Sequence, residues 1–117
     1  MPTDTKTTID RTSSPGGASV AVLRFSGDIS STSKESVLGA WQTVSGTGPV
    51  LLDFSKVDYI NSSGIGLIIT ILMEAGKTGQ KVAAFGLTPH FQKVFTMVGI
   101  GKYAGLFKDQ ESAAASL

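Results

Sequence analysis

The segment Val50-Leu-Leu-Asp-Phe54 constrains the fold of this chain more than any other. It is a short and almost continuously apolar run. Runs of this kind are typical of strands that are buried on both faces in the centre of a sheet with parallel neighbours. Such a strand needs helices on the faces of its sheet. The segment therefore predicts an α/β domain built on a small, mostly parallel sheet.

Strand patterns and helix patterns alternate along the rest of the chain. The run Ser19–Ser26 alternates as a strand does, Thr88-Pro89 has the N-cap and first-turn residues of a helix, and Asp109 precedes an Ala-rich helical segment. This alternation predicts a mixed, mostly parallel sheet of about four or five strands, covered by about four helices. We expect the strands at residues 19–26, 50–54, 81–85 and 103–107, and the helices after Thr32, at 64–78, from Pro89 to Val98 and after Asp109.

The first residues differ in composition from the rest. Residues 1–17 are rich in Thr, Ser, Pro and Gly, and Ile9 is their only apolar side chain after Met1. We interpret them as a flexible N-terminal tail with a short edge strand at residues 7–12. Residues 18–117 are then the single domain, which is long enough to fold without disulfides or a structural metal.

The composition excludes several classes of function. The chain has no cysteine and one histidine, His90, which we interpret as solvent-facing. These counts argue against a thiol nucleophile, a serine-hydrolase base and Cys- or His-ligated metals. The formal net charge is +1 and the lysines are scattered, so the sequence does not predict nucleic-acid binding. We expect no catalysis, no metal and no cofactor.

The sequence also predicts no insertion into a membrane. Its longest nearly apolar stretch, Ile65–Met73, has nine residues, whereas a spanning helix needs about 20. The first residues, Met1-Pro-Thr-Asp-Thr-Lys, have no apolar core behind their charges, so they do not form a secretory signal. We therefore expect a cytoplasmic protein.

The segment Asn61-Ser-Ser-Gly64 carries the most specific information. It places two adjacent hydroxyls, of Ser62 and Ser63, between the central strand and an apolar helix. Helix N-termini present unpaired N–H groups and the positive end of the helix dipole, which attract anions. Gly64 and Gly66 would let a partner backbone or a phosphoryl donor come close.

The spacing of residues in this segment bears on three other interpretations. Asn61 and one of the two serines could simply cap the helix, and this interpretation stays open. A dinucleotide loop does not fit, because Gly64-Ile-Gly66 lacks the third glycine and no Gly-Lys-Ser/Thr follows. A nucleophile elbow does not fit either, since no glycine stands two residues before Ser62 or Ser63.

The run Val57-Asp-Tyr-Ile-Asn-Ser-Ser-Gly-Ile-Gly-Leu67 strongly resembles the signature of the STAS domain family, the anti-sigma-factor antagonists of bacteria. Leu23-Arg-Phe-Ser-Gly-Asp-Ile29 resembles the early strand of that family. The segments Gly79–Phe85 and Thr88–Gly99 are similar to its later strand and helix. The resemblance covers nearly the whole chain and implies the STAS fold.

The resemblance implies partner switching in the control of transcription. In such antagonists the first serine of the motif, here Ser62, is phosphorylated by an anti-sigma factor that is also a serine kinase. The unphosphorylated form binds that kinase and frees the sigma factor, and a serine phosphatase is a further partner. Asn61, Ser63, Gly64 and Asp28 are then expected to support the phosphorylation site.

A docking face is expected beside the phosphorylation site. The resemblance and the helical pattern place Ser30, Ile65, Leu67 and Ile71 on it. Leu67 and Ile71 fall on the outer side of the helix, away from its main apolar stripe, and such a face often meets another protein. The alternative is a helix that is buried on both sides.

Two residues depart from the family pattern. Asn61 stands where the family commonly has Asp directly before the phosphorylated serine, and Ser30 stands where many relatives have Asp. Asn keeps the shape and hydrogen bonding of Asp without its charge. Two alternatives follow: an accessory subunit of a membrane ABC transporter for lipids or anions that is not phosphorylated, and a nucleotide-binding sensor that uses the same helix N-terminus.

Overall fold

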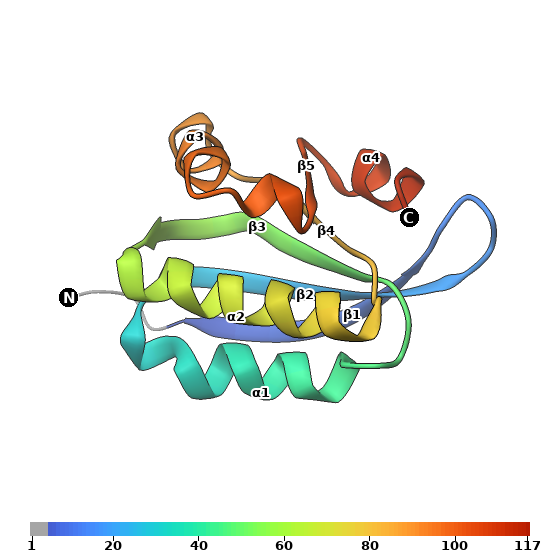
Figure 1. Cartoon of the computed structure of the whole chain (residues 1–117), viewed down its shortest axis with the longest axis horizontal. Helices are drawn as coiled ribbons and strands as arrows, with labels where there is room; N and C mark the ends of the chain where they lie inside the picture. The colour runs from blue at the N-terminus through green and yellow to red at the C-terminus, as the bar shows by residue number, and fades with distance from the viewer. Residues whose placement is uncertain (1–4) are drawn as a thin grey trace.

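The structure, a computed structural model that describes residues 5–117, contains a sheet in the strand order β1-β2-β3-β4-β5 (Figure 1). β1 is antiparallel to β2, and all other neighbours are parallel. The predicted fold class is therefore confirmed. In the described residues the strands are β1 (Lys6–Ser13), β2 (Ser19–Ile29), β3 (Val50–Ile60), β4 (Val82–Phe85) and β5 (Gly105–Phe107), and the helices are α1 (Lys34–Val44), α2 (Ser62–Thr78), α3 (Pro89–Met97) and α4 (Gln110–Ala115), with the 3-10 turns η1 (Ser31–Ser33) and η2 (Ile100–Lys102).

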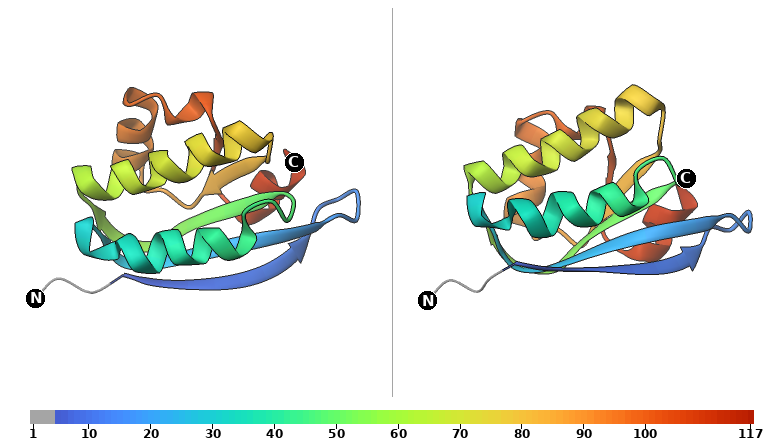
Figure 2. Two further views of the ribbon diagram at one scale, coloured as in Figure 1. Left: turned by 60° about the horizontal axis from the view of Figure 1, so that its bottom comes forward. Right: turned by 90° about the horizontal axis from the view of Figure 1, so that it is seen from below.

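Helices cover the sheet on both faces. α1 and α2 lie side by side over one face, whereas α4 lies against the opposite face (Figure 2). The larger core lies beneath α1 and α2 and extends to α3. The smaller core lies between the sheet and α4, where Ala113 and Ala114 meet Val22 and Leu51. Alternate residues of β2 and β3 therefore face different cores.

Aromatic side chains hold the larger core together. Phe54 of β3 lies with its ring centroid 5.2 Å from that of Phe25 in β2 and 5.5 Å from that of Phe95 in α3. Trp41 of α1 is buried, and its Nε1 donates a hydrogen bond of 2.8 Å to Oε2 of Glu74 in α2. This bond satisfies the only polar atom of a buried indole and joins the two helices.

The order of the elements brings two strand ends together. β2 and β3 are parallel, and they are connected by α1; α2 then connects β3 to β4. In this register Asp28 is paired with Tyr59, and Ile29 with Ile60. Because the carboxyl ends of parallel neighbours lie at one edge of a sheet, the turn after β2 and the start of α2 are neighbours.

Several boundaries differ from the sequence-based prediction. β3 continues six residues beyond Phe54 to Ile60, and it makes two shifts of register against β2 on the way. In this extension Val57 and Ile60 are buried while the residues between them are exposed. The predicted caps are confirmed: Thr88 Oγ1 accepts from the Phe91 amide at 3.3 Å, and Asp109 Oδ1 accepts from the Ser112 amide at 2.8 Å.

The predicted edge strand at residues 7–12 lies within β1, which pairs with β2 along its whole length. The predicted tail, residues 1–17, falls partly on residues 1–4, which lie outside the described residues. The division into residues 1–17 and 18–117 stays a prediction. None of the described helices has both the length and the apolar character needed to cross a membrane.

The first turn of α2 packs directly against the end of β2. A Cβ atom added to Gly64 would lie 2.3 Å from the carbonyl oxygen of Ile29, whereas one added to Gly66 would meet no atom within 4 Å. Both glycines belong to the same helix. Of these two positions, only position 64 requires glycine, because the backbones of α2 and β2 approach each other closely there.

We expect Gly64→Ala to lower the free energy of unfolding by about 2 kcal/mol, because the added methyl group forces the helix away from β2. Gly66→Ala is the matched control, and it should leave stability unchanged or raise it by up to about 1 kcal/mol. Urea denaturation of both variants measures the difference. Equal effects of the two substitutions would contradict the packing seen at Gly64.

Candidate functional site

The candidate site lies at the sheet edge where β2 and β3 end and α2 begins. Asn61 fixes this junction through its backbone and its side chain. Its amide donates to the carbonyl oxygen of Ile29 at 3.1 Å, and its Oδ1 accepts from the amide of Gly64 at 2.8 Å. Asn61 is thus the N-cap of α2. The capping interpretation is confirmed for Asn61 and for neither serine.

Ser62 and Ser63 are the first two residues of α2, and both are exposed. In the part of the chain that the structure describes, neither hydroxyl has a hydrogen-bond partner, and neither do the two amides. The first amides of a helix have no acceptor within the helix, so these two are available to an anion. The arrangement can accept a phosphoryl group on either hydroxyl and favours the negative charge that results.

The turn after β2 is built from hydroxyl groups. Ser33 is buried, and its Oγ accepts from the amide of Ser30 at 2.9 Å and donates to the carbonyl oxygen of Asp28 at 3.3 Å. Thr5, just before β1, also donates to the Asp28 carbonyl oxygen, and its hydroxyl contacts that of Ser33. These bonds hold the turn beside Ile29, and thereby beside α2.

Asp28 and Ser30 therefore lie at the same edge as Asn61, Ser62, Ser63 and Gly64. Both are half-buried. Among the described residues, however, no hydrogen bond joins the Asp28 carboxylate to Ser62. The functional groups at this edge are hydroxyls, one side-chain amide, the Asp28 carboxylate and backbone N–H groups. No group of three acidic or histidine side chains within residues 5–117 is placed to hold a metal ion.

The predicted docking face needs one correction. Ile65 and Leu67 are half-buried, but Ile71 is 0% exposed and belongs to the larger core. A helix with a single apolar stripe would leave Ile71 exposed to solvent. Here α1 packs beside α2, so the flank of α2 that carries Ile71 is covered as well. The buried face of α2 is therefore rotated relative to the face that the sequence pattern predicts. Met73, which the pattern places on the buried face, is 49% exposed.

Tyr59 is a candidate contact residue that the sequence pattern does not predict. Its side chain is 56% exposed, and its ring packs edge-to-face on Phe91 at a centroid distance of 5.9 Å. The sequence predicts a strand that ends at Phe54, so Tyr59 falls outside the predicted strand. The signal that could have found it is the apolar pair Val57 and Ile60, which brackets exposed positions in the same strand.

Comparison with known proteins places the chain in a family. The family model described as "Mlab, STAS domain" matches residues 15–108. A protein of Bordetella bronchiseptica, BtrV, which is provisionally named an anti-sigma factor antagonist, is 27% identical over 77 residues. That match covers 66% of this chain and 66% of BtrV, just under two thirds of its length.

Solved structures share the fold. An anti-sigma factor antagonist from Mycobacterium paratuberculosis matches with a TM-score of 0.80 and 17% identity, over 97% of this chain and 93% of that one. SpoIIAA of Bacillus, in its phosphorylated form, matches with a TM-score of 0.67 and 18% identity, over 94% and 96% of the two chains. The family model, which covers most of the chain, and the shared fold agree with the predicted resemblance. The chain therefore belongs to the STAS domain family.

Proposed function

We propose that this protein is an anti-sigma-factor antagonist that binds an anti-sigma-factor serine kinase and is switched by phosphorylation of Ser62. The observation that carries the proposal is the exposed Ser62 hydroxyl at the start of α2, which has no partner among the described residues. The names of BtrV and of the mycobacterial protein support it. On this proposal the chain is a cytoplasmic binding module and not an enzyme.

The helix can carry the phosphate without unfolding. A phosphate adds about −1.5 to −2 charges and three acceptor oxygens. At the first residue of α2 it would meet the positive end of a 17-residue helix and the free amides of Ser62 and Ser63. Because its own helix tolerates the charge, the phosphate acts on the partner. SpoIIAA, which shares the fold, is known in a phosphorylated form.

The surface around Ser62 suits a switched interface. We define the docking surface as Ser30, Tyr59, Ser62, Ile65 and Leu67. Ile65 lies three residues after Ser62, so the two share one face of α2. The partly exposed apolar side chains of Ile65 and Leu67 offer contact area to a partner. A kinase that covers Ile65 also covers the Ser62 hydroxyl on the same face of α2, and the phosphate then adds charge and bulk where contact is made. A serine phosphatase would restore binding.

The first prediction of this proposal concerns the site of modification. We expect the kinase partner and ATP to add one phosphate to the wild-type chain and to Ser63→Ala, and none to Ser62→Ala. Intact-mass analysis followed by peptide mapping measures this. Ser63→Ala is the matched control because it removes the neighbouring exposed hydroxyl from the same helix turn. A phosphate mapped to Ser63, or its absence from all three proteins, would contradict the proposal.

The second prediction concerns the partner. In affinity capture from native lysate, wild type and Ser62→Ala should retain a kinase-type anti-sigma factor, whereas Ser62→Glu should lose it because the carboxylate mimics part of the phosphate charge. Mass spectrometry identifies what each bait holds. An ABC-type ATPase held equally by all three baits would instead make the chain a transporter subunit that is not switched at Ser62.

The third prediction separates capping from modification. Asn61→Ala removes the side chain that accepts from the Gly64 amide, so it should lower the free energy of unfolding by about 1 kcal/mol. Ser62→Ala should change it by less than about 0.5 kcal/mol, because the hydroxyl makes no bond within the described chain. Urea denaturation compares the two. A loss at Ser62→Ala as large as that at Asn61→Ala would make Ser62 a structural cap.

A further inference from the structure

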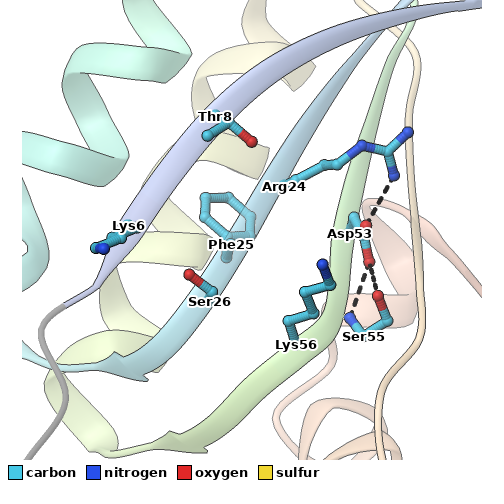
Figure 3. Close-up of a pocket in the computed structure, with 8 residues that line it drawn as sticks. All are labelled: Lys6, Thr8, Arg24, Phe25, Ser26, Asp53, Ser55 and Lys56. Atoms are coloured by element: carbon cyan, nitrogen blue, oxygen red, sulfur yellow. Dashed lines mark hydrogen bonds and ion pairs between the residues drawn. The ribbon is translucent and has the colours of Figure 1, made fainter.

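A second polar site lies on the sheet face opposite α1 and α2, away from Ser62. Thr7 of β1 faces α1, since its Oγ1 hydrogen-bonds to Ser36 at 2.8 Å. Strand alternation therefore turns Lys6 and Thr8 to the other face. There a depression of about 430 Å³ lies over β1, β2 and β3 (Figure 3). It is lined by Lys6, Thr8, Arg24, Phe25, Ser26, Asp53, Ser55 and Lys56.

An ion pair forms the floor of this depression. Nη1 of Arg24 lies 2.8 Å from Oδ2 of Asp53, whose side chain is 8% exposed. The other oxygen, Oδ1, accepts from the amide of Ser55 at 2.8 Å and from its hydroxyl at 2.6 Å (Figure 3). Both carboxylate oxygens are thus occupied. The Arg24 guanidinium offsets the negative charge of Asp53 at the floor of the depression.

The guanidinium of Arg24 is held in place from two other elements. Its Nη2 donates to Asp10 of β1 at 3.1 Å and to Gln110 of α4 at 2.9 Å, and its Nε donates to Asp10 at 3.3 Å. Burial lowers the pKa of Arg24, but its hydrogen bonds to Asp53 and Asp10 outweigh burial and raise the pKa overall. A guanidinium has five N–H donors. One donor on Nη1 remains without a partner among the described residues.

The walls of the depression present donors. Lys6 and Lys56 are exposed, and neither forms an ion pair with any described residue. In Figure 3 the ammonium group of Lys56 points into the space between Ser26 and Asp53. Three cationic side chains and one carboxylate line the depression, and a second carboxylate, that of Asp10, pairs with Arg24. The site therefore keeps an excess of positive charge, and the hydroxyl groups of Thr8 and Ser26 add to its donors.

We propose that this depression binds a small anion that carries a phosphate group. The two ammonium groups would neutralise the phosphate, and the free Arg24 N–H and the hydroxyl groups would donate hydrogen bonds to its oxygens. The volume is within the range of small-ligand sites. Such an anion would contact residues of three strands, β1, β2 and β3, at the same time. The proposal is independent of phosphorylation at Ser62, which begins α2 and does not line the depression.

The test is an NMR titration of the full chain with inorganic pyrophosphate at constant ionic strength. We expect saturable shifts of the amide signals of residues 6, 8, 26, 55 and 56. Lys56→Gln and Lys6→Gln should each weaken the affinity about ten-fold, because each removes one charge-assisted contact. Lys77→Gln is the matched control: it removes the same charge from the last turn of α2, outside the depression, and should leave the affinity unchanged.

Three outcomes would overturn the proposal. They are shifts that do not saturate, shifts confined to the first turn of α2, and an equal loss of affinity in Lys56→Gln and Lys77→Gln, which would show a general charge effect. Circular dichroism without pyrophosphate shows whether each variant is folded. Should Lys56→Gln be unfolded, the comparison of Lys6→Gln with Lys77→Gln decides. None of these outcomes tests kinase binding, and shifts confined to the first turn of α2 would place the anion at Ser62 and Ser63 instead of in the depression.

Discussion

The close contact between the first turn of α2 and the end of β2 determines the geometry of the candidate site. Gly64 lies against the Ile29 carbonyl with no room for a Cβ atom, and the Asn61 amide donates to the same carbonyl oxygen. Together they fix where α2 begins relative to the turn after β2. The exposed position of Ser62 follows from this contact, because Ser62 lies two residues before Gly64, about 200° away around the helix, and so faces away from β2.

The junction divides structural and functional roles between neighbouring residues. Asn61 supplies the capping oxygen, so neither serine is needed to close the first turn of the helix. The two hydroxyls and two amides that remain are available to a phosphate. A modification placed there adds charge that the helix dipole favours. A switch of this kind changes which partner can bind while the domain keeps its fold.

The opposite face of the sheet is organised around a different interaction. Arg24 reaches β1, β3 and α4 through Asp10, Asp53 and Gln110. Removing Asp53 would leave a partly buried guanidinium with fewer partners, which costs more than the net value of the ion pair itself. The same network holds Arg24 in one orientation at the floor of the polar depression. The two faces of one sheet therefore offer two chemically distinct surfaces.

The sequence by itself determined the fold class, the caps at Thr88 and Asp109, and the motif Asn61–Gly64, because each depends on residues close together in the chain. Periodicity and capping are local properties, and they can be recognised without knowing the neighbours. Only the tertiary structure decided that β3 continues to Ile60 and that Ile71 is buried. Both depend on distant segments: β2 offers a partner to the extension of β3, and α1 covers the flank of α2 that carries Ile71.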